Sequence, residues 1–194
     1  MSLLDRLFGR SSGRVPGPGA VAPTLYLAVV EQARIPEFYT DCGVPDTVDG
    51  RFDLIVLHAF LLFRRLKDEG PAGEAVSQAV FDTMMSDMDR NLREMGVGDL
   101  GVGKRIKKMA YAFYGRLKVY DRELDPATRD DAGLTEALRR NLWGAAQAPE
   151  VGLAAIAAYV RRATEVLAAQ PADALLAGQV AFPEAPRVDV GEAG

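Results

Sequence analysis

The chain has 194 residues, 48% of them hydrophobic and 26% charged, which fits one globular domain and leaves little room for two. A formal net charge of -4 and a pI near 5.1 exclude a protein that coats nucleic acid over its whole surface, so an anionic partner would have to meet a local basic patch. The single cysteine, Cys42, excludes an intramolecular disulfide and favours a reducing compartment.

The N-terminal segment, residues 1–23, is predicted to be flexible, with the folded domain beginning at Thr24. Residues 11–23 are rich in Gly, Pro and Ser, which is typical of a linker. No apolar run resembles a secretory signal. The four apolar side chains between Leu3 and Phe8 lie beside two arginines and would form a small amphipathic patch on a helix. Such a patch can rest on anionic lipid, and a frayed terminus is the alternative.

The next part of the chain is predicted to be helical. Thr24 can cap a helix that ends before Pro36, and a short turn at 37–41 and a loop at 43–50 follow. Residues 51–67 are apolar nearly all round. The apolar run is about half as long as a bilayer span requires, so we expect a buried central helix.

Two further helices are expected at 73–95 and 104–123, separated by glycines. Gly96 is predicted to end the first of them. The first helix has an apolar stripe at spacings of three and four, formed by Val76, Val80, Met84, Met88, Leu92 and Met95. The second is expected to bury Ile106, Met109, Ala110, Phe113, Leu117 and Tyr120.

The C-terminal part is predicted to contain helices at 134–143 and 149–169, a last turn at 173–180 and a disordered tail at 182–194. No segment shows sustained period-two alternation. The predicted fold is therefore all-α, a single compact domain of five to seven helices over residues 24–181 around the apolar central helix.

A possible phosphate loop occurs where the two middle helices meet. Residues Gly98 to Lys104 fit the pattern G-x-x-x-x-G-K, but Arg105 replaces the Ser or Thr that would hold magnesium. A helix rather than a strand precedes the glycines. We therefore interpret them as a helix C-cap and a tight reversal, and we expect no nucleotide site.

Six basic residues and no acidic residue occur between positions 104 and 118. A cation in the first turn of a helix is disfavoured by the macrodipole, which hints at an external role for the first two. One interpretation is docking to phosphate, in RNA or lipid headgroups, or to an acidic protein face. The alternative is internal pairing with Asp82, Asp87, Asp89, Glu94 and Asp99. The six are Lys104, Arg105, Lys107, Lys108, Arg116 and Lys118.

Other reactive or adaptable side chains are few. Met85 lies off the main apolar stripe, so it is a candidate contact for a hydrophobic client. His58 is predicted to be a hydrogen-bonded core residue, and Cys42 lacks the partners of a thiol nucleophile. No metal-ligand spacing, nucleophile elbow or dinucleotide fingerprint is found. The absence of these motifs is only weak evidence against an enzyme, and no cofactor site is expected.

Three stretches together resemble the ubiquinol–cytochrome c chaperone family, the assembly factors of respiratory complex III. They are LYLAVVEQARIPEFYTDCGVPDTVDGRFDLIVLHAFLLFRRL, then MDRNLREMGVGD, then VGKRIKKMAYAFYGRLKVY. The resemblance extends from Leu25 to Glu123 and more loosely into the C-terminal helices.

The resemblance implies a helical, non-enzymatic chaperone that receives newly made cytochrome b, or complex III assembly intermediates. A small partner protein, the ribosome and an anionic membrane surface are further candidate partners. Because no mitochondrial presequence is evident, we expect a bacterial relative in the cytoplasm or on the inner face of the inner membrane. An RNA- or ribosome-binding module acting through residues 104–118 is the alternative function.

Overall fold

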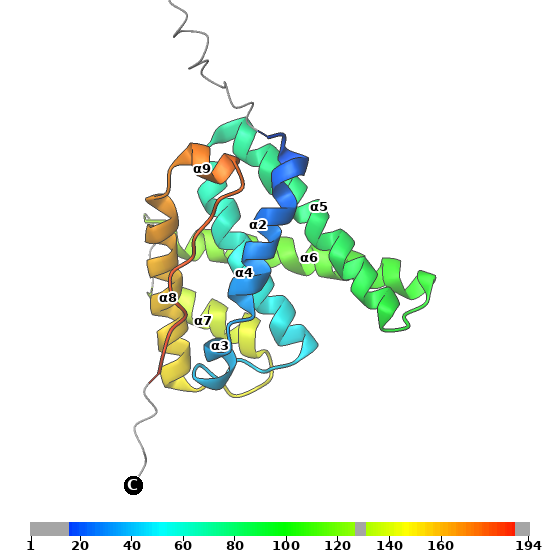
Figure 1. Cartoon of the computed structure of the whole chain (residues 1–194). Coiled ribbons are helices and arrows are strands. Elements are labelled where there is room, and N and C mark those ends of the chain that lie inside the picture. The colour runs from blue at the N-terminus through cyan, green and yellow to red at the C-terminus, as the bar shows by residue number, and fades with distance from the viewer. Residues whose placement is uncertain (1–15, 127–130, 189–194) are drawn as a thin grey trace, which may run out of the picture.

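The computed structural model describes residues 16–126 and 131–188, and helices make up most of both stretches (Figure 1). No β-strand occurs in these two stretches, so the all-α prediction is confirmed. Nor does any helix of the described residues have the length and apolar character needed to cross a membrane. In chain order the elements are α2 Pro18–Ala33, α3 Glu37–Thr40, α4 Val48–Lys67, α5 Gly70–Glu94, α6 Asp99–Glu123, α7 Asp131–Leu138, the π-helix η1 Arg139–Trp143, α8 Glu150–Ala168 and α9 Ala172–Leu176.

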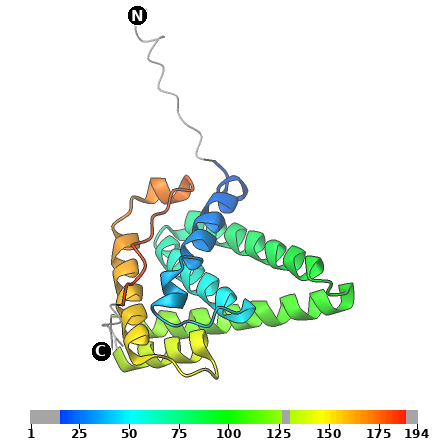
Figure 2. The same cartoon turned by 60° about the horizontal axis from the view of Figure 1, so that its bottom comes forward.

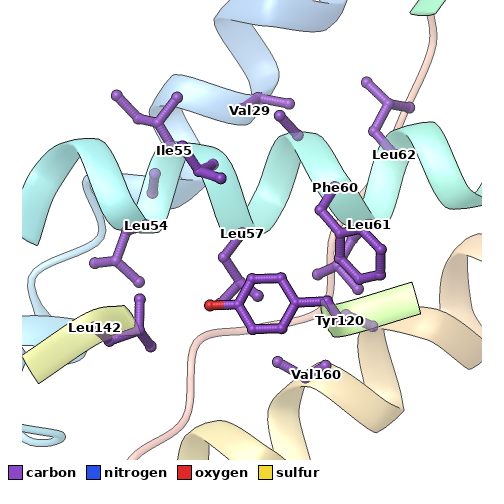
Figure 3. Packing of buried hydrophobic residues seen from close by; sticks show 14 of the residues in the cluster. Val29, Leu54, Ile55, Leu57, Phe60, Leu61, Leu62, Tyr120, Leu142 and Val160 are labelled. Carbon is purple, nitrogen blue, oxygen red and sulfur yellow. The ribbon is translucent and has the colours of Figure 1, made fainter. Parts of the chain in front are cut away.

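Helix α4 is the centre of the core, as the sequence predicts. Thr47 caps it by accepting a hydrogen bond from the Gly50 amide at 3.1 Å. Side chains of α2, α6, η1 and α8 meet those of α4 on several sides (Figure 3). Every α4 residue from Phe52 to Leu62 is buried. Its burial on all faces explains why the sequence of α4 lacks a polar stripe.

Two arginines near the end of α4 fix the ends of two other helices. Arg64 donates to the Leu124 carbonyl, just beyond α6, at 2.9 Å and also pairs with Asp121. Arg65 donates to the carbonyls of Leu167 and Gln170, at the end of α8, at 3.0 and 2.9 Å. A helix C-terminus carries unpaired carbonyls and partial negative charge, so both contacts are electrostatically favourable.

Helices α5 and α6 form an antiparallel hairpin whose far end extends away from the helices around α4 (Figures 1 and 2). Gly96, with φ of 80°, ends α5 as predicted. Its amide donates to the Arg93 carbonyl and the Val97 amide donates to the Leu92 carbonyl, the paired hydrogen bonds of a Schellman motif. The predicted reversal is therefore present, but it is shorter than expected because α6 begins at Asp99.

The start of the folded region differs from the prediction. Helix α2 begins at Pro18, so residues 18–23 are helical rather than part of a linker, and Val21 is buried in the core. Proline is tolerated in the first turn of a helix, which the composition argument overlooked. In the same way Gly70 and Pro71 begin α5 rather than separate two helices.

The C-terminal segment also differs from the prediction, because residues 182–188 pack along the body instead of forming a disordered tail. The Phe182 ring meets the His58 ring edge to face at 5.4 Å. Gln32 donates to the Pro183 carbonyl at 2.9 Å, and Arg162 donates to the Glu184 carbonyl at 2.8 Å. The predicted lipid patch at residues 3–8 and the end of the predicted tail, 189–194, lie outside the described residues.

Candidate functional site

A groove of about 700 Å³ opens between the N-terminal half of α4, the middle of α6 and the segment that contains η1. The end of α5 closes it on one side. Its apolar lining includes Phe52, Leu92, Met95, Met109, Leu142 and Trp143. A cavity of this size with apolar walls is large enough to hold several side chains of a bound segment.

The groove has a cationic lining in a protein whose net charge is negative. Four basic side chains line it, and two carboxyl groups, Asp49 and Asp53, face them. An Arg116 nitrogen lies 2.6 Å from an Asp53 oxygen, and both side chains are mostly buried. The other three, Arg105, Lys108 and Arg140, form no ion pair with any carboxylate in the described part of the chain. The basic members are Arg105, Lys108, Arg116 and Arg140.

In the buried pair of Asp53 and Arg116, the Asp53 carboxyl has a shifted pKa, and one Arg116 nitrogen has no hydrogen-bond partner in the described part of the chain. Burial raises the pKa of the Asp53 carboxyl to about 7; Arg116 lowers it and Asp49 raises it further. The Nε atom of Arg116 is buried and has no hydrogen-bond partner among the described residues. A buried unpaired donor is costly, so a ligand oxygen at this position would be favourable.

The six predicted basic residues are divided between two faces of α6. Arg105, Lys108 and Arg116 face the groove. Lys104 and Lys107 lie on a second exposed face, and Lys118 continues that face one turn after Tyr114. The six cations that the sequence analysis considered together therefore lie on two faces of the helix.

Internal pairing with the upstream acids, the alternative interpretation, is not what the structure shows for these cations. Asp89 binds Arg93 at 2.6 Å, and Asp99 also pairs with Arg93. Asp87 pairs with Arg90 and accepts a hydrogen bond from Tyr26 at 2.9 Å. These three acids are therefore engaged with arginines of α5, and five of the six predicted cations, all but Arg116, form no ion pair within the described residues.

Helix α6 begins earlier than the sequence predicted, which affects two of the expectations. Lys104 and Arg105 do not lie in the first turn, because the helix begins at Asp99, so the macrodipole argument does not apply to them. The residues of the apparent phosphate loop after Gly98 are helical. A helix therefore precedes and follows Gly98, and Arg105 occupies the position of the magnesium-binding hydroxyl, so the segment differs from a strand-loop-helix phosphate loop.

The methionine at the groove is Met95 rather than Met85, the residue singled out from the sequence. Met85 is half-buried and packs against the core, so it does not line the groove. Met95 was expected to be buried on the apolar stripe, yet it is 57% exposed and lines the groove. It lies one residue before Gly96, where α5 has passed beyond the helices that cover its apolar stripe.

The remaining reactive side chains are structural. His58 is fully buried, with Nδ1 2.8 Å from the Leu54 carbonyl and Nε2 2.8 Å from the Tyr159 hydroxyl. Burial lowers the pKa of His58 to about 4, so the ring is neutral as predicted for a core histidine. Burial raises the pKa of the Cys42 thiol to about 11, which makes it a poor nucleophile. Among the described residues no three potential metal ligands gather.

The sequence that forms the fold and the groove matches a known family. A model of the family described as ubiquinol-cytochrome C chaperone matches residues 40–182, which include the central helix, the basic helix and the groove. The chain belongs to this family. A crystal structure of the Cbp3 homolog from Brucella abortus is similar, with a TM-score of 0.77 and 36% identity, over 96% of this chain and 100% of that one.

Curated relatives point the same way. The ubiquinol-cytochrome-c reductase complex assembly factor 1 of Xenopus laevis is 28% identical over 81% of this chain and 78% of its own length. The Homo sapiens and Mus musculus proteins of that name are each 29% identical. This chain spans about half of the human and mouse proteins, 52% of each.

Sequence reasoning missed several groove residues. Asp49, Asp53, Arg140 and Trp143 are far from the basic helix along the chain, and only packing brings them to it. Trp143 is held in place by donation from its indole nitrogen to the Gly43 carbonyl at 2.8 Å. The one available signal was Asp53, an acidic residue beside the longest apolar run, since a charge at such a place usually has a partner.

Proposed function

We propose that this protein is an assembly chaperone of respiratory complex III, that its client is newly made cytochrome b, and that the groove is the client site. The observation that carries the proposal is the groove itself, an apolar cavity with unpaired cations, in a member of this chaperone family. The proposal extends to this chain what the names of its relatives say of complex assembly.

The chemistry of the groove suits an unassembled segment of a membrane protein. Apolar side chains of such a segment would be shielded by the methionine, phenylalanine and tryptophan of the lining. Backbone carbonyls or a carboxylate of the client would bind the free cations and the Arg116 Nε atom. Both contacts are reversible, which a chaperone that releases its client requires.

The proposal is tested by site-specific photo-crosslinking in cells that assemble complex III. A photoreactive residue replaces Met95, which is exposed and lines the groove, or Val151, which is exposed on α8 and does not line it. We expect a crosslink to cytochrome b from position 95 and none from position 151. Equal crosslinking from both positions, or from neither, would contradict the groove as the client site.

A charge-reversal pair sharpens the test. Arg105→Glu with Lys108→Glu changes the groove face, and Lys104→Glu with Lys107→Glu makes the same charge change on the other face. We expect the first pair to lower cytochrome b recovery in pull-downs from nuclease-treated, detergent-solubilised membranes, where the encounter needs no bilayer, and the second pair to retain it. Recovery of ribosomal RNA without cytochrome b in the same pull-down without nuclease would instead favour the RNA-binding alternative.

The site of action and further partners stay predictions. We place the protein at the inner face of a bacterial inner membrane, where newly made cytochrome b would emerge.

A further inference from the structure

The face of α6 that turns away from the groove has a composition unlike that of an ordinary solvated helix. Its residues recur at spacings of four, three, four and seven, so they lie on one stripe of the helix. We call this stripe the outer lysine face, and Tyr114 borders it. It consists of Leu100, Lys104, Lys107, Tyr111 and Lys118, all exposed.

The outer lysine face combines cations with exposed apolar groups and has no acid. Leu100 is 96% exposed and Tyr111 is 71% exposed. Lys107 lies 5.9 Å from the centre of the Tyr111 ring, so the two side chains stand side by side. No ion pair joins these three lysines to a carboxylate anywhere in residues 16–126 or 131–188. Among the described residues, therefore, no carboxylate pairs with the lysines of this face, and its large apolar side chains are left exposed.

The position of this face makes it accessible to a flat partner. Leu100 is in the first turn of α6, at the far end of the hairpin, which extends beyond the body in both views (Figures 1 and 2). Met95, 57% exposed, is close by at the end of α5. The hairpin end can therefore reach a surface without a clash from the body.

We propose that the outer lysine face docks the protein on an anionic lipid bilayer, with Leu100 entering the headgroup region and the three lysines binding lipid phosphates. Lysine next to anionic lipid and tyrosine at the membrane interface are both favourable. The aliphatic side chain at the tip favours lipid over RNA, because RNA recognition relies on stacking and arginine forks. Of the six predicted cations, the two arginines, Arg105 and Arg116, face the groove instead.

The net charge of the protein gives the docking a direction. Because the whole chain carries -4, most of its surface is repelled by an anionic membrane. Only a local basic face is attracted, so the protein would settle with α6 toward the lipid. Because the groove lies on a different face of the same helix, docking through the outer lysine face would leave the groove uncovered.

The test is flotation of the full chain with vesicles of phosphatidylglycerol and phosphatidylcholine, and with phosphatidylcholine alone. The variant is Lys104→Gln with Lys107→Gln, and the matched control is Arg105→Gln with Lys108→Gln, which removes the same charge from the groove face. About fivefold in affinity per lysine predicts a loss of about twenty- to thirtyfold for the lysine pair. We expect the control to change affinity by less than about threefold, and salt to weaken binding of the wild type.

A labelled variant reports insertion. Leu100→Cys takes an environment-sensitive dye, because the other cysteine, Cys42, is buried. The dye should move to shorter wavelength with anionic vesicles and remain unchanged with phosphatidylcholine. Lys118→Gln, at the other end of the face, should also weaken binding, which gives a second variant if the pair alters folding by circular dichroism.

The proposal is overturned if the lysine pair floats as the wild type does, if both pairs lose affinity equally, or if the dye does not respond. It is also overturned if the lysine pair loses affinity for single-stranded RNA but not for vesicles, since the face would then be an RNA site. The assay contains no cytochrome b, so its result does not depend on the proposed client.

Discussion

The helices around α4 and the far end of the α5–α6 hairpin use their apolar residues in opposite ways. In the body, apolar side chains from α2, α4, α6, α7, η1 and α8 enter one buried cluster. At the hairpin end, from Arg93 to Gly101, no residue is fully buried, and large apolar groups point to solvent. The body therefore supplies most of the free energy of folding, and the hairpin end leaves apolar surface exposed that contributes little to it.

The largest test of this comparison is Phe60→Ala in the body against Leu100→Ala at the hairpin end. Phe60 is 2% exposed and lies 5.3 Å from the Tyr120 ring, so its removal should cost about 3 to 5 kcal/mol of unfolding free energy. Leu100→Ala should cost less than about 0.5 kcal/mol. Urea unfolding of both variants is the measurement, and similar costs would contradict the division.

The buried histidine predicts a dependence of stability on pH. The pKa of His58 is about 4 in the folded state and about 6.5 when unfolded, so between these values only the unfolded chain takes up a proton. Its contribution is present above pH 6.5 and is lost as the pH falls toward 4, by up to about 3 kcal/mol. The measurement is the stability difference between wild type and His58→Gln from pH 7 to pH 4.

Comparing the stability of wild type with that of His58→Gln at each pH cancels the contribution of Asp53, which has the opposite pH dependence, because both proteins contain Asp53. The pKa of Asp53 is raised to about 7 in the folded state, so its contribution is present at low pH and is lost as the pH rises toward 7. A stability difference that stays constant across the window would show that His58 is not buried as a neutral ring.

Breaking the contact between α4 and the end of α8 should lower the unfolding free energy by less than a core substitution does, but by more than a substitution at the hairpin end. Arg65→Gln removes the guanidinium that donates to the Leu167 and Gln170 carbonyls. We expect a loss of about 2 kcal/mol, because charged hydrogen bonds to partly buried acceptors are lost. Lys107→Gln on exposed α6 surface is the control and should be nearly neutral in thermal unfolding.

The smallest expected effect in the body is at its C-terminal segment. Phe182→Ala removes the edge-to-face contact with His58 and should cost about 1 to 2 kcal/mol, mostly through lost aromatic packing. Hydrogen exchange of the Ala181 amide, which donates to Gln170 at 2.9 Å, should accelerate as the segment loosens. If neither changes, residues 182–188 contribute nothing to the fold in solution.

Much of the fold was available from the sequence because helical periodicity and burial are local signals. The apolar run of α4, the stripe through Val76, Val80 and Met84, and the buried face of α8 all lie where the pattern placed them. The C-cap at Gly96 was also predictable, since a left-handed residue after a periodic stretch favours glycine.

Composition was a poorer guide at the two ends of the domain. Pro18 and Pro23 suggested a linker, yet α2 tolerates them because burial of Val21 and Ala22 offsets the hydrogen bond lost within the helix. Residues 182–188 lack periodicity. They pack only because side chains of α2, α4 and α8 contact them in the folded protein. Such contacts depend on partners distant in sequence.

The sequence by itself determined the all-α class, the central helix, the concentration of cations on α6 and the family resemblance. Tertiary structure decided which of those cations lie together in space. Arg105, Lys108 and Arg116 join Asp53, Arg140 and Trp143 in the groove, whereas Lys104, Lys107 and Lys118 face outward. A helix presents its residues every 100°, so the sequence fixes the angle between the two faces, but only the packing of α4, α5 and η1 decides which face becomes a groove.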